Sequence, residues 1–189
     1  MKVMITGAHG HLGASVVEAF SRWDVVAFPH RQLDITDRTA VRNAVLDARP
    51  DVLINCAAYN NVDAAEDDPS RAIEVNGIAV GGLAAAARLA GASFVHYSTD
   101  FVFDGGTTRP YAEEDPPSPR SVYALSKLLG EYLASDAPRA YVLRVESLFG
   151  GPTEGHGARL GTFGSMVAKL RAREPITVFA DRVVSPSYA

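Results

Sequence analysis

Short apolar runs alternate with amphipathic stretches along most of this 189-residue chain. The apolar runs have the length of single buried strands, and Gly, Pro or small polar residues follow most of them. Five strands are expected, at residues 2–6, 25–28, 51–55, 93–97 and 139–145. We expect a further extended segment at residues 176–179.

The stretches between these runs have helical spacing. One helix is expected to start within residues 34–37, where Thr36 or Asp37 can act as the N-cap, and to end before Pro50. Loops are expected at 56–69, 105–119 and 150–161, which are rich in Gly, Pro, small or acidic residues. The remaining helices are expected at residues 14–20, 70–89, 121–134 and 163–171.

Strands that alternate with helices predict the α/β class. The expected architecture is a Rossmann-type, doubly wound parallel sheet covered by helices on both faces. Ligands of such sheets bind outside the carboxyl ends of the strands. The turn after the first strand, the 56–69 loop and residues 98–100 all fall at that edge.

Three glycines at intervals of three residues follow the first strand: Gly7, Gly10 and Gly13. Gly7 would permit a tight turn, Gly10 a close approach of the backbone to a pyrophosphate, and Gly13 close packing of the helix on the strand. The helix N-terminus would offer free N–H groups to the phosphates. The order strand, glycine turn, helix therefore predicts a dinucleotide site, although this spacing differs from the G-x-G-x-x-G of most dehydrogenases.

Composition narrows the possible functions. The formal net charge is −4 and no block of Lys or Arg stands out, which argues against nucleic-acid and anionic-membrane partners. Cys56 is the single cysteine, so an intrachain disulfide is excluded and a reducing, cytoplasmic setting fits. The Ala-rich stretch 78–95 is interrupted by Arg88, and we interpret it as a packed helix followed by a strand.

Tyr123 and Lys127 lie four residues apart on a predicted helix and so share one face. A phenol has a pKa near ~10, and a neighbouring ammonium group would lower that pKa by favouring the phenolate. The hydroxyl of Thr99, at the end of the fourth strand, could hold a carbonyl oxygen beside the phenol. These three residues are candidates for a proton-transfer site.

The chain resembles the extended short-chain dehydrogenase/reductases, and within them the dTDP-4-dehydrorhamnose reductase group of nucleotide-sugar reductases. The run Ser-Thr-Asp-Phe-Val-Phe-Asp-Gly is the most specific element of this similarity, which covers essentially the whole chain. The segments that carry it are residues 7–13, 33–37, 49–59, 62–63, 75–76, 98–105, 123–127 and 185–189.

The resemblance implies a nicotinamide cofactor and a role for each matched residue. Thr99 would bind the substrate carbonyl, Tyr123 would donate the proton, and Lys127 would hold the nicotinamide ribose and tune Tyr123. Asp100 and Ser147 would lie beside the sugar. The remaining cofactor contacts would be made by Gly7, Gly10, His11, Leu12 and Gly13 at the pyrophosphate, Asp34 and Ile35 at the adenine, and Ala57, Ala58, Tyr59 and Asn76 on the inner side.

Some positions depart from the family pattern. The second strand is followed by Pro-His-Arg and lacks an acid for the ribose 2′-hydroxyl, so Arg31 favours NADP(H) over NAD(H). Ser147 stands where the family has a tryptophan against the sugar, and Phe101 where a tyrosine is usual. These changes leave the hydride chemistry intact but make the rhamnose precursor less certain as the substrate.

The expected organisation is an NAD(P)-binding Rossmann domain at residues 1–149, followed at 150–189 by the start of a substrate lobe. Family members continue beyond residues 185–189, so this lobe is expected to be incomplete and turnover of the chain feeble. The expected activity is NAD(P)H-dependent reduction of a 4-keto nucleotide sugar, without a metal, and a homodimer is the oligomeric state considered. Two alternatives stay open: an epimerase or dehydratase of the same superfamily, or a non-catalytic, cofactor-binding regulatory subunit.

Overall fold

The computed structural model describes residues 1–151, 161–178 and 185–189. Its centre is one sheet in which every pairing between neighbouring strands is parallel. Each strand begins within one residue of its expected start, because the apolar runs are buried in this sheet. In spatial order the strands are β2 (Asp24–Phe28), β1 (Lys2–Thr6), β3 (Val52–Asn55), β4 (Ser93–Thr99) and β5 (Ala140–Val145).

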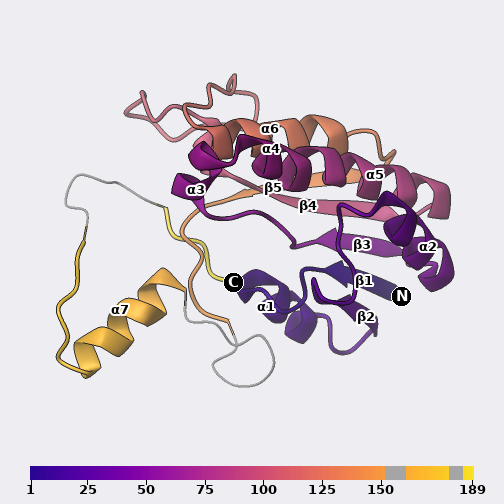
Figure 1. Ribbon diagram of the computed structural model, residues 1–189, viewed down its shortest axis with the longest axis horizontal. Helices are drawn as coiled ribbons and strands as arrows, with labels where there is room; N and C mark the ends of the chain where they lie inside the picture. The colour runs from indigo at the N-terminus through magenta and orange to yellow at the C-terminus, as the bar shows by residue number, and fades with distance from the viewer. Residues whose placement is uncertain (152–160, 179–184) are drawn as a thin grey trace.

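Helices lie on both faces of the sheet, as the alternating pattern predicts (Figure 1). One face carries α2 (Arg38–Ala48), α5 (Ala79–Ala90) and α6 (Val122–Ala134), and the other carries α1 (His11–Ala19). The α7 helix (Thr162–Arg171) lies apart from the sheet in Figure 1. The doubly wound α/β class is therefore confirmed for the part of the chain that the structure describes.

The helix expected at 70–89 is interrupted. It consists of α4 (Pro69–Ile73), a π-helical turn (Glu74–Ile78) and then α5. A π turn inserts one extra residue into a helix and rotates the side chains that follow it. The turn contains the buried residue Asn76, and Gly77 lets it approach α6, since a Cβ there would meet the Leu129 side chain at 2.6 Å.

The 56–69 segment is not entirely a loop, and this expectation was wrong in part. It contains α3 (Val62–Asp67), whose N-cap is Asn61: its side chain accepts a hydrogen bond from the Ala64 N–H at 3.0 Å. Asp37, rather than Thr36, caps α2 in the same way. Residues 174–178 form no strand, while most of the 150–161 loop and residue 179 lie outside the described residues.

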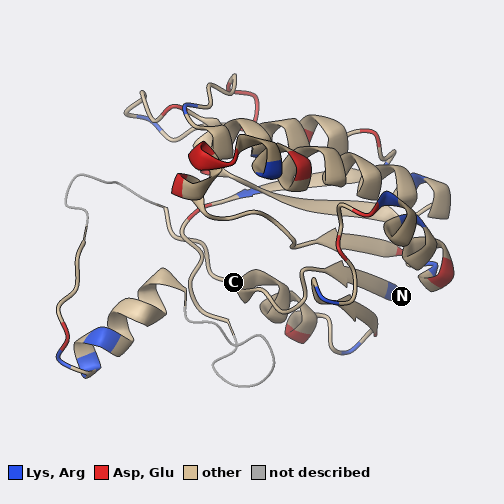
Figure 2. Cartoon of the chain, viewed as in Figure 1, with Lys and Arg blue, Asp and Glu red and all other residues tan. Residues whose placement is uncertain are grey.

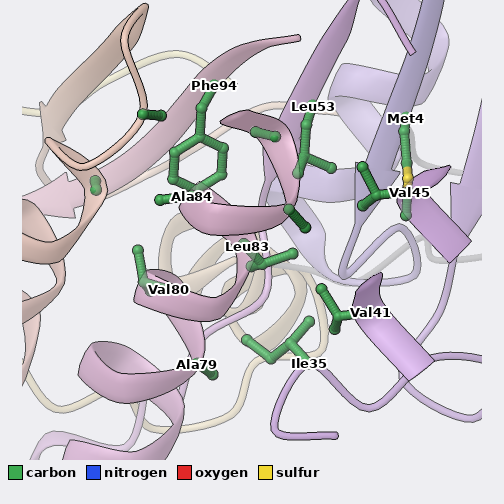
Figure 3. Packing of buried hydrophobic residues seen from close by; sticks show 14 of the residues in the cluster. Met4, Ile35, Val41, Val45, Leu53, Ala79, Val80, Leu83, Ala84 and Phe94 are labelled. Atoms are coloured by element: carbon green, nitrogen blue, oxygen red, sulfur yellow. The ribbon is translucent and has the colours of Figure 1, made fainter. Parts of the chain in front are cut away.

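The main core lies between the sheet and the α2–α5–α6 layer (Figure 3). Phe94 and Leu53 from the sheet meet Leu83 from α5, and all three side chains are fully buried. Alanines on α5 allow the helix to lie close to the strands. The helical run Pro69–Ala90 is long and apolar enough to cross a membrane by length and composition alone, but 56% of that window is buried inside the protein.

Charged residues of both signs are interspersed over the described chain (Figure 2). Lys169 and Arg171 lie in the last turn of α7, where cations interact favourably with the helix dipole. Cys56 is partly buried and packs against the apolar cluster on the α1 face of the sheet.

Candidate active site

The candidate site lies at the carboxyl edge of the sheet. In the sheet, β2 lies on one side of β1 and β3 lies on the other. The connections therefore run in opposite directions from β1, and the topological switch point lies between β1 and β3. Open α/β sheets bind ligands in the crevice at such a switch point. The glycine turn after β1 and the Ala57–Tyr59 segment after β3 flank this point, and Thr99 ends the next strand.

The glycine turn has the shape that a dinucleotide phosphate group requires. Gly7 has φ +69° and lies so close to Ala57 that a Cβ would meet its backbone nitrogen at 2.5 Å. At Gly13 a Cβ would lie 2.2 Å from the Gly7 carbonyl oxygen. Gly10 caps α1 without a side-chain hydrogen bond, so the first N–H groups of α1 remain available to an anion. These residues fit the predicted cofactor.

A buried amide connects three strands at this edge. The Asn55 side-chain oxygen accepts hydrogen bonds from the Thr6 hydroxyl at 2.7 Å and from the Ala57 N–H at 3.1 Å. Its side-chain nitrogen must therefore be the donor to His96 Nδ1, 3.1 Å away. Burial lowers the pKa of His96 well below its ordinary value, so the ring is neutral and accepts at Nδ1. Asn55 thus fixes the start of the Ala57–Tyr59 segment.

Asn76 holds the other end of that segment. Its side-chain oxygen accepts from the Tyr59 N–H at 2.8 Å, and its side-chain nitrogen donates to the Tyr59 carbonyl and the Ser126 hydroxyl, both at 3.0 Å. Ser126 in turn donates to the Tyr123 carbonyl at 2.7 Å. The π turn, the segment after β3 and the helix with the candidate proton donor are therefore joined through one buried side chain.

Replacing Asn76 by alanine is expected to lower the free energy of unfolding by ~2 kcal/mol, because two partly buried backbone groups of Tyr59 and the buried Ser126 hydroxyl lose a hydrogen-bond partner. The Ala57–Tyr59 segment should loosen, and NADPH should bind more weakly. Urea unfolding and fluorescence titration measure the two effects. The matched control is Asn61→Ala, which removes one exposed cap and should leave NADPH affinity unchanged. Equal behaviour of both variants would contradict a role for Asn76 at the site.

The structure brings Thr99, Tyr123 and Lys127 together, because α6 packs against β4. Lys127 is only 3% exposed, and its ammonium group donates to the Tyr97 carbonyl at 2.6 Å. Burial lowers the pKa of Lys127 to about 8, while the charges of Glu131 and Cys56 act in the opposite direction. A buried amine with such a pKa is typical of functional sites.

The pKa of Tyr123 is raised, contrary to the expectation that Lys127 lowers it. Burial of the phenol is the main cause, hydrogen bonding with Thr99 opposes it, and the charge of Asp100 adds to it. In this structure the Lys127 ammonium group binds the Tyr97 carbonyl. Tyr123 is therefore held as a neutral phenol, the form that can donate a proton.

Asp100 lies directly beside the Thr99 hydroxyl. Thr99 donates to the Asp100 carboxylate at 3.0 Å and accepts from the Phe101 N–H at 3.2 Å. Burial and the nearby Glu146 carboxylate raise the pKa of Asp100. A substrate carbonyl oxygen could accept a hydrogen bond from the Thr99 hydroxyl only by replacing Asp100 as the acceptor.

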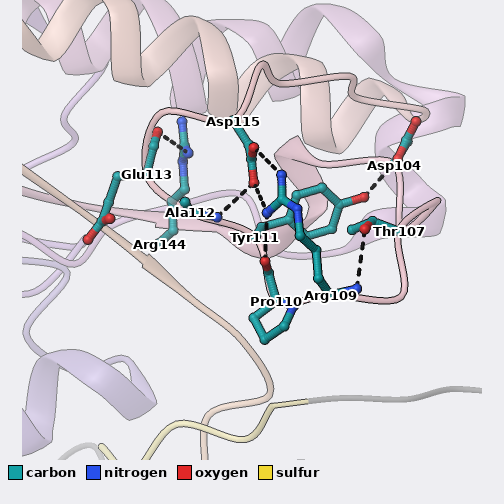
Figure 4. Close-up of polar contacts among 9 residues, drawn as sticks. All are labelled: Asp104, Thr107, Arg109, Pro110, Tyr111, Ala112, Glu113, Asp115 and Arg144. Atoms are coloured by element: carbon teal, nitrogen blue, oxygen red, sulfur yellow. Dashed lines mark hydrogen bonds and ion pairs between the residues drawn. The ribbon is translucent and has the colours of Figure 1, made fainter.

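The loop after β4 is cross-linked by its own side chains and contacts Arg144 of β5 (Figure 4). The rings of Phe103 and Tyr111 stack at 4.2 Å, and the Arg144 guanidinium lies 4.8 Å from the Phe103 ring while it binds Glu131 through two hydrogen bonds. Near the start of this loop, Phe101 packs edge-on against Tyr123, with ring centroids 6.1 Å apart. The loop therefore helps to hold the candidate proton donor in place.

Only part of the expected adenosine end is exposed to solvent. Arg31 is exposed, Ile35 is buried, and the Asp34 carboxylate accepts from the Thr36 N–H at 3.0 Å. The hydrogen bonds from Thr36 and the nearby charges of His30 and Arg71 outweigh the effect of burial and hold the pKa of Asp34 below its ordinary value. Ser147 lies beyond β5 in a left-handed conformation, with φ +42°, and is exposed.

Sequence reasoning missed several supporting residues: Asn55, His96, Ser126, Glu146 and Arg71. Asn55 and His96 left a signal, since each is a polar residue that follows strongly apolar positions within a predicted strand. Glu146 and Arg71 left none, because only the folded chain places them beside Asp100 and Asp34.

The parallel sheet, the glycine turn and the Thr99–Tyr123–Lys127 arrangement define a Rossmann-fold protein of the extended short-chain dehydrogenase/reductase class. More narrowly, the chain belongs to the family described as the RmlD substrate binding domain, which it matches over residues 1–189. Both conclusions agree with the resemblance noted from the sequence.

Known proteins with similar chains include dTDP-4-dehydrorhamnose reductases. The Burkholderia thailandensis protein is 38% identical over 192 residues, with 100% of this chain and 62% of the relative covered. The Streptomyces griseus protein is 42% identical over 184 residues, with 94% of this chain and 58% of the relative covered. This chain therefore spans about three-fifths of the length of these curated relatives.

A solved structure is also closely similar. It is the crystal structure of dTDP-4-dehydrorhamnose reductase from Bacillus anthracis str. Ames in complex with NADP. The TM-score is 0.89 at 35% identity, and the match covers 99% of this chain and 66% of that protein.

Proposed function

We propose that this chain is the cofactor-binding and catalytic part of an NADP(H)-dependent reductase that acts on a 4-keto nucleotide sugar. The observation that carries the proposal is the convergence of Thr99, Tyr123 and the buried Lys127 on the carboxyl edge that also bears the glycine turn. The similarity to dTDP-4-dehydrorhamnose reductases, one of them solved with NADP, supports this substrate class and a place in dTDP-rhamnose-type sugar biosynthesis.

Each of the three residues has one task in this proposal. Bound NADPH supplies a hydride, that is, an electron pair with its hydrogen, to the ketone carbon. Thr99 holds the ketone oxygen, and Tyr123 transfers its phenolic proton to that oxygen as the alcohol forms. The Lys127 ammonium group holds the nicotinamide ribose, and solvent returns a proton to Tyr123 after the alcohol has formed. The raised pKa of Tyr123 suits a donor that must keep its proton until the hydride is transferred.

The test is oxidation of NADPH by the chain in the presence of a panel of 4-keto nucleotide sugars. Formation of the 4-hydroxy product would support the reductase. Isolation of the chain with tightly bound NAD, together with epimerised or dehydrated product, would favour the epimerase or dehydratase alternative. NADPH binding without any turnover, in a form extended to the length of the relatives, would favour the regulatory subunit.

NADP(H) is the proposed cofactor in preference to NAD(H), because Arg31 is exposed just after β2 and can reach a 2′-phosphate. Wild-type protein should bind NADPH at least tenfold more tightly than NADH, a difference of ~1.4 kcal/mol. Arg31→Ala should abolish this preference by weakening NADPH binding alone. Fluorescence titration of both cofactors gives the affinities.

The matched control for Arg31 is Arg22→Ala, which removes another surface arginine whose guanidinium lies 5.0 Å from the Trp23 ring centroid. It should leave both affinities unchanged. Equal affinity of the wild type for NADPH and NADH would reject the preference.

The remaining assignments extend the same proposal. Residues 1–149 would form the cofactor domain and 150–189 the start of the substrate lobe, with Asp100 and Ser147 beside the sugar. A cytoplasmic location fits the single cysteine. A homodimer is consistent with Leu125 and Tyr132, which are 52% and 62% exposed and share one face of α6.

A further inference from the structure

The chain directly after β5 is linked to residues near its C-terminus. We call residues 146–151 and 185–189 the post-β5 unit. Two hydrogen bonds join its parts: the Phe149 N–H donates to the Ser187 carbonyl at 3.0 Å, and the Ala189 N–H donates to the Phe149 carbonyl at 2.8 Å. The rings of Phe149 and Tyr188 pack with centroids 5.4 Å apart. The pairing is an isolated bridge. So short a pairing has little stability of its own, and the position of the unit depends on what it packs against.

His11, the first residue of α1, contacts this unit directly. Its Nε2 lies 2.7 Å from the Gly150 carbonyl oxygen. Because a carbonyl only accepts, Nε2 carries the proton and donates. His11 also belongs to the glycine turn proposed to bind the cofactor pyrophosphate. One residue therefore joins the phosphate turn to the unit that carries Ser147.

Glycines allow this contact to be close. Gly151 has φ +80°, and a Cβ there would lie 2.5 Å from the Ser15 hydroxyl oxygen. A Cβ at Gly161 would lie 2.6 Å from the His11 ring. A side chain at either position would push aside the Ser15 side chain or the His11 ring. The sequence of this segment therefore suits a tight fit around His11.

Beyond His11 the unit and α1 are separated by a pocket of about 260 Å³. Its lining is mostly apolar and includes Leu12 and Val16 from α1 and Leu148 and Tyr188 from the unit. The contact at His11 is consequently important for holding the unit over the N-terminal end of α1.

We propose that His11 is a positioning residue that couples occupancy of the phosphate turn to the placement of the post-β5 unit. The inference rests on the proposed function, since it requires a dinucleotide at residues 7–13. A phosphate bound to the first N–H groups of α1 fixes the His11 backbone and, through it, the ring and Gly150. Cofactor binding then orders the surface on which the sugar would rest, and linkage requires the effect to be reciprocal.

Hydrogen exchange of peptides covering residues 146–151, with and without saturating NADPH, tests this coupling. In the wild type, NADPH should slow exchange there about tenfold, because local opening of the unit becomes rarer when the His11 ring is held in place. In His11→Ala the unit should exchange faster without cofactor and show no slowing at an NADPH concentration that saturates the variant. His11→Gln should restore the slowing, because the Gln amide can donate to Gly150.

A second pair of variants tests the coupling without changing His11. Gly151→Ala should also reduce the slowing, because its Cβ crowds the Ser15 hydroxyl and the His11 ring at their contact with the segment. Gly91→Ala is the control: it has a similar left-handed φ of +69° but nothing within 4 Å, so the slowing should persist. NADPH-dependent protection that is unchanged in His11→Ala would overturn the coupling. Wild-type protein that fails to bind NADPH would instead overturn the proposed function.

Discussion

Tyr123→Phe is expected to lower the rate of ketone reduction by about 10²- to 10⁴-fold, the contribution of a positioned general acid. The substitution removes one oxygen atom and leaves the ring that packs against Phe101. The fold and NADPH affinity should therefore be preserved. A variant that lost cofactor binding as well would show that Tyr123 acts mainly through structure.

The rate is best measured in single turnovers with protein in excess over NADPH, because the chain spans about three-fifths of its curated relatives and its substrate contacts are expected to be weak. A displacement of about 1 Å at the ketone can cost ~100-fold in rate. The same comparison should be repeated with a form extended to the full length of the Bacillus anthracis relative. An ordinary rate of ~10 per second for the short chain would show that the expected further lobe is dispensable.

Gly13→Ala is expected to weaken NADPH binding about 100-fold, equivalent to ~3 kcal/mol. A Cβ at this position would lie 2.2 Å from the Gly7 carbonyl oxygen and 2.9 Å from the Ala8 Cα, and both are backbone atoms that cannot rotate away. The turn and α1 must then separate, so the N–H groups aimed at the pyrophosphate lose their geometry. Isothermal titration with NADPH measures this loss directly, and thermal unfolding reports the accompanying strain.

Gly82→Ala provides the matched control for Gly13. It also lies in a helix, but its Cβ would meet only the Arg38 side chain, at an ordinary 3.6 Å. Its NADPH affinity should equal that of the wild type, and stability should be unchanged or slightly higher, since Ala favours helix over Gly by about 1 kcal/mol. Similar losses in both variants would mean that the glycine turn has no special part in cofactor binding.

The departures from the family pattern suggest where the substrate choice lies. Ser147 replaces the family's tryptophan and is exposed in a strained conformation, while Phe101 packs on Tyr123 and lacks the hydroxyl of the usual tyrosine. Relative to the pattern that the resemblance implies, the proposed substrate side would lose a large ring and a hydrogen-bonding group, whereas Thr99, Tyr123 and Lys127 are kept. We expect the reaction type to be shared with the relatives and the preferred sugar to be the feature that differs.

The sequence alone determined the fold class and most of the candidate site. Strand–helix alternation sufficed for the parallel sheet, because buried strands and amphipathic helices each leave a periodic pattern. The glycine spacing, the Tyr123–Lys127 spacing and the resemblance together placed the expected cofactor and catalytic residues at one edge. These are local signals, carried by residues a few positions apart.

Only the tertiary structure decided which side chains hold the site in place and in which direction its pKa values shift. Asn55 and Asn76 connect segments 17 to 50 residues apart, and His11 reaches Gly150 across 139 residues. The π turn that contains Asn76 and the direction of the Tyr123 pKa shift also depend on packing. Burial and the Asp100 charge raise that pKa against the hydrogen bond with Thr99, and Lys127 is directed to the Tyr97 carbonyl. Hydrogen bonds and desolvation act through space, so contacts between distant parts of the chain leave no periodic signal in the sequence.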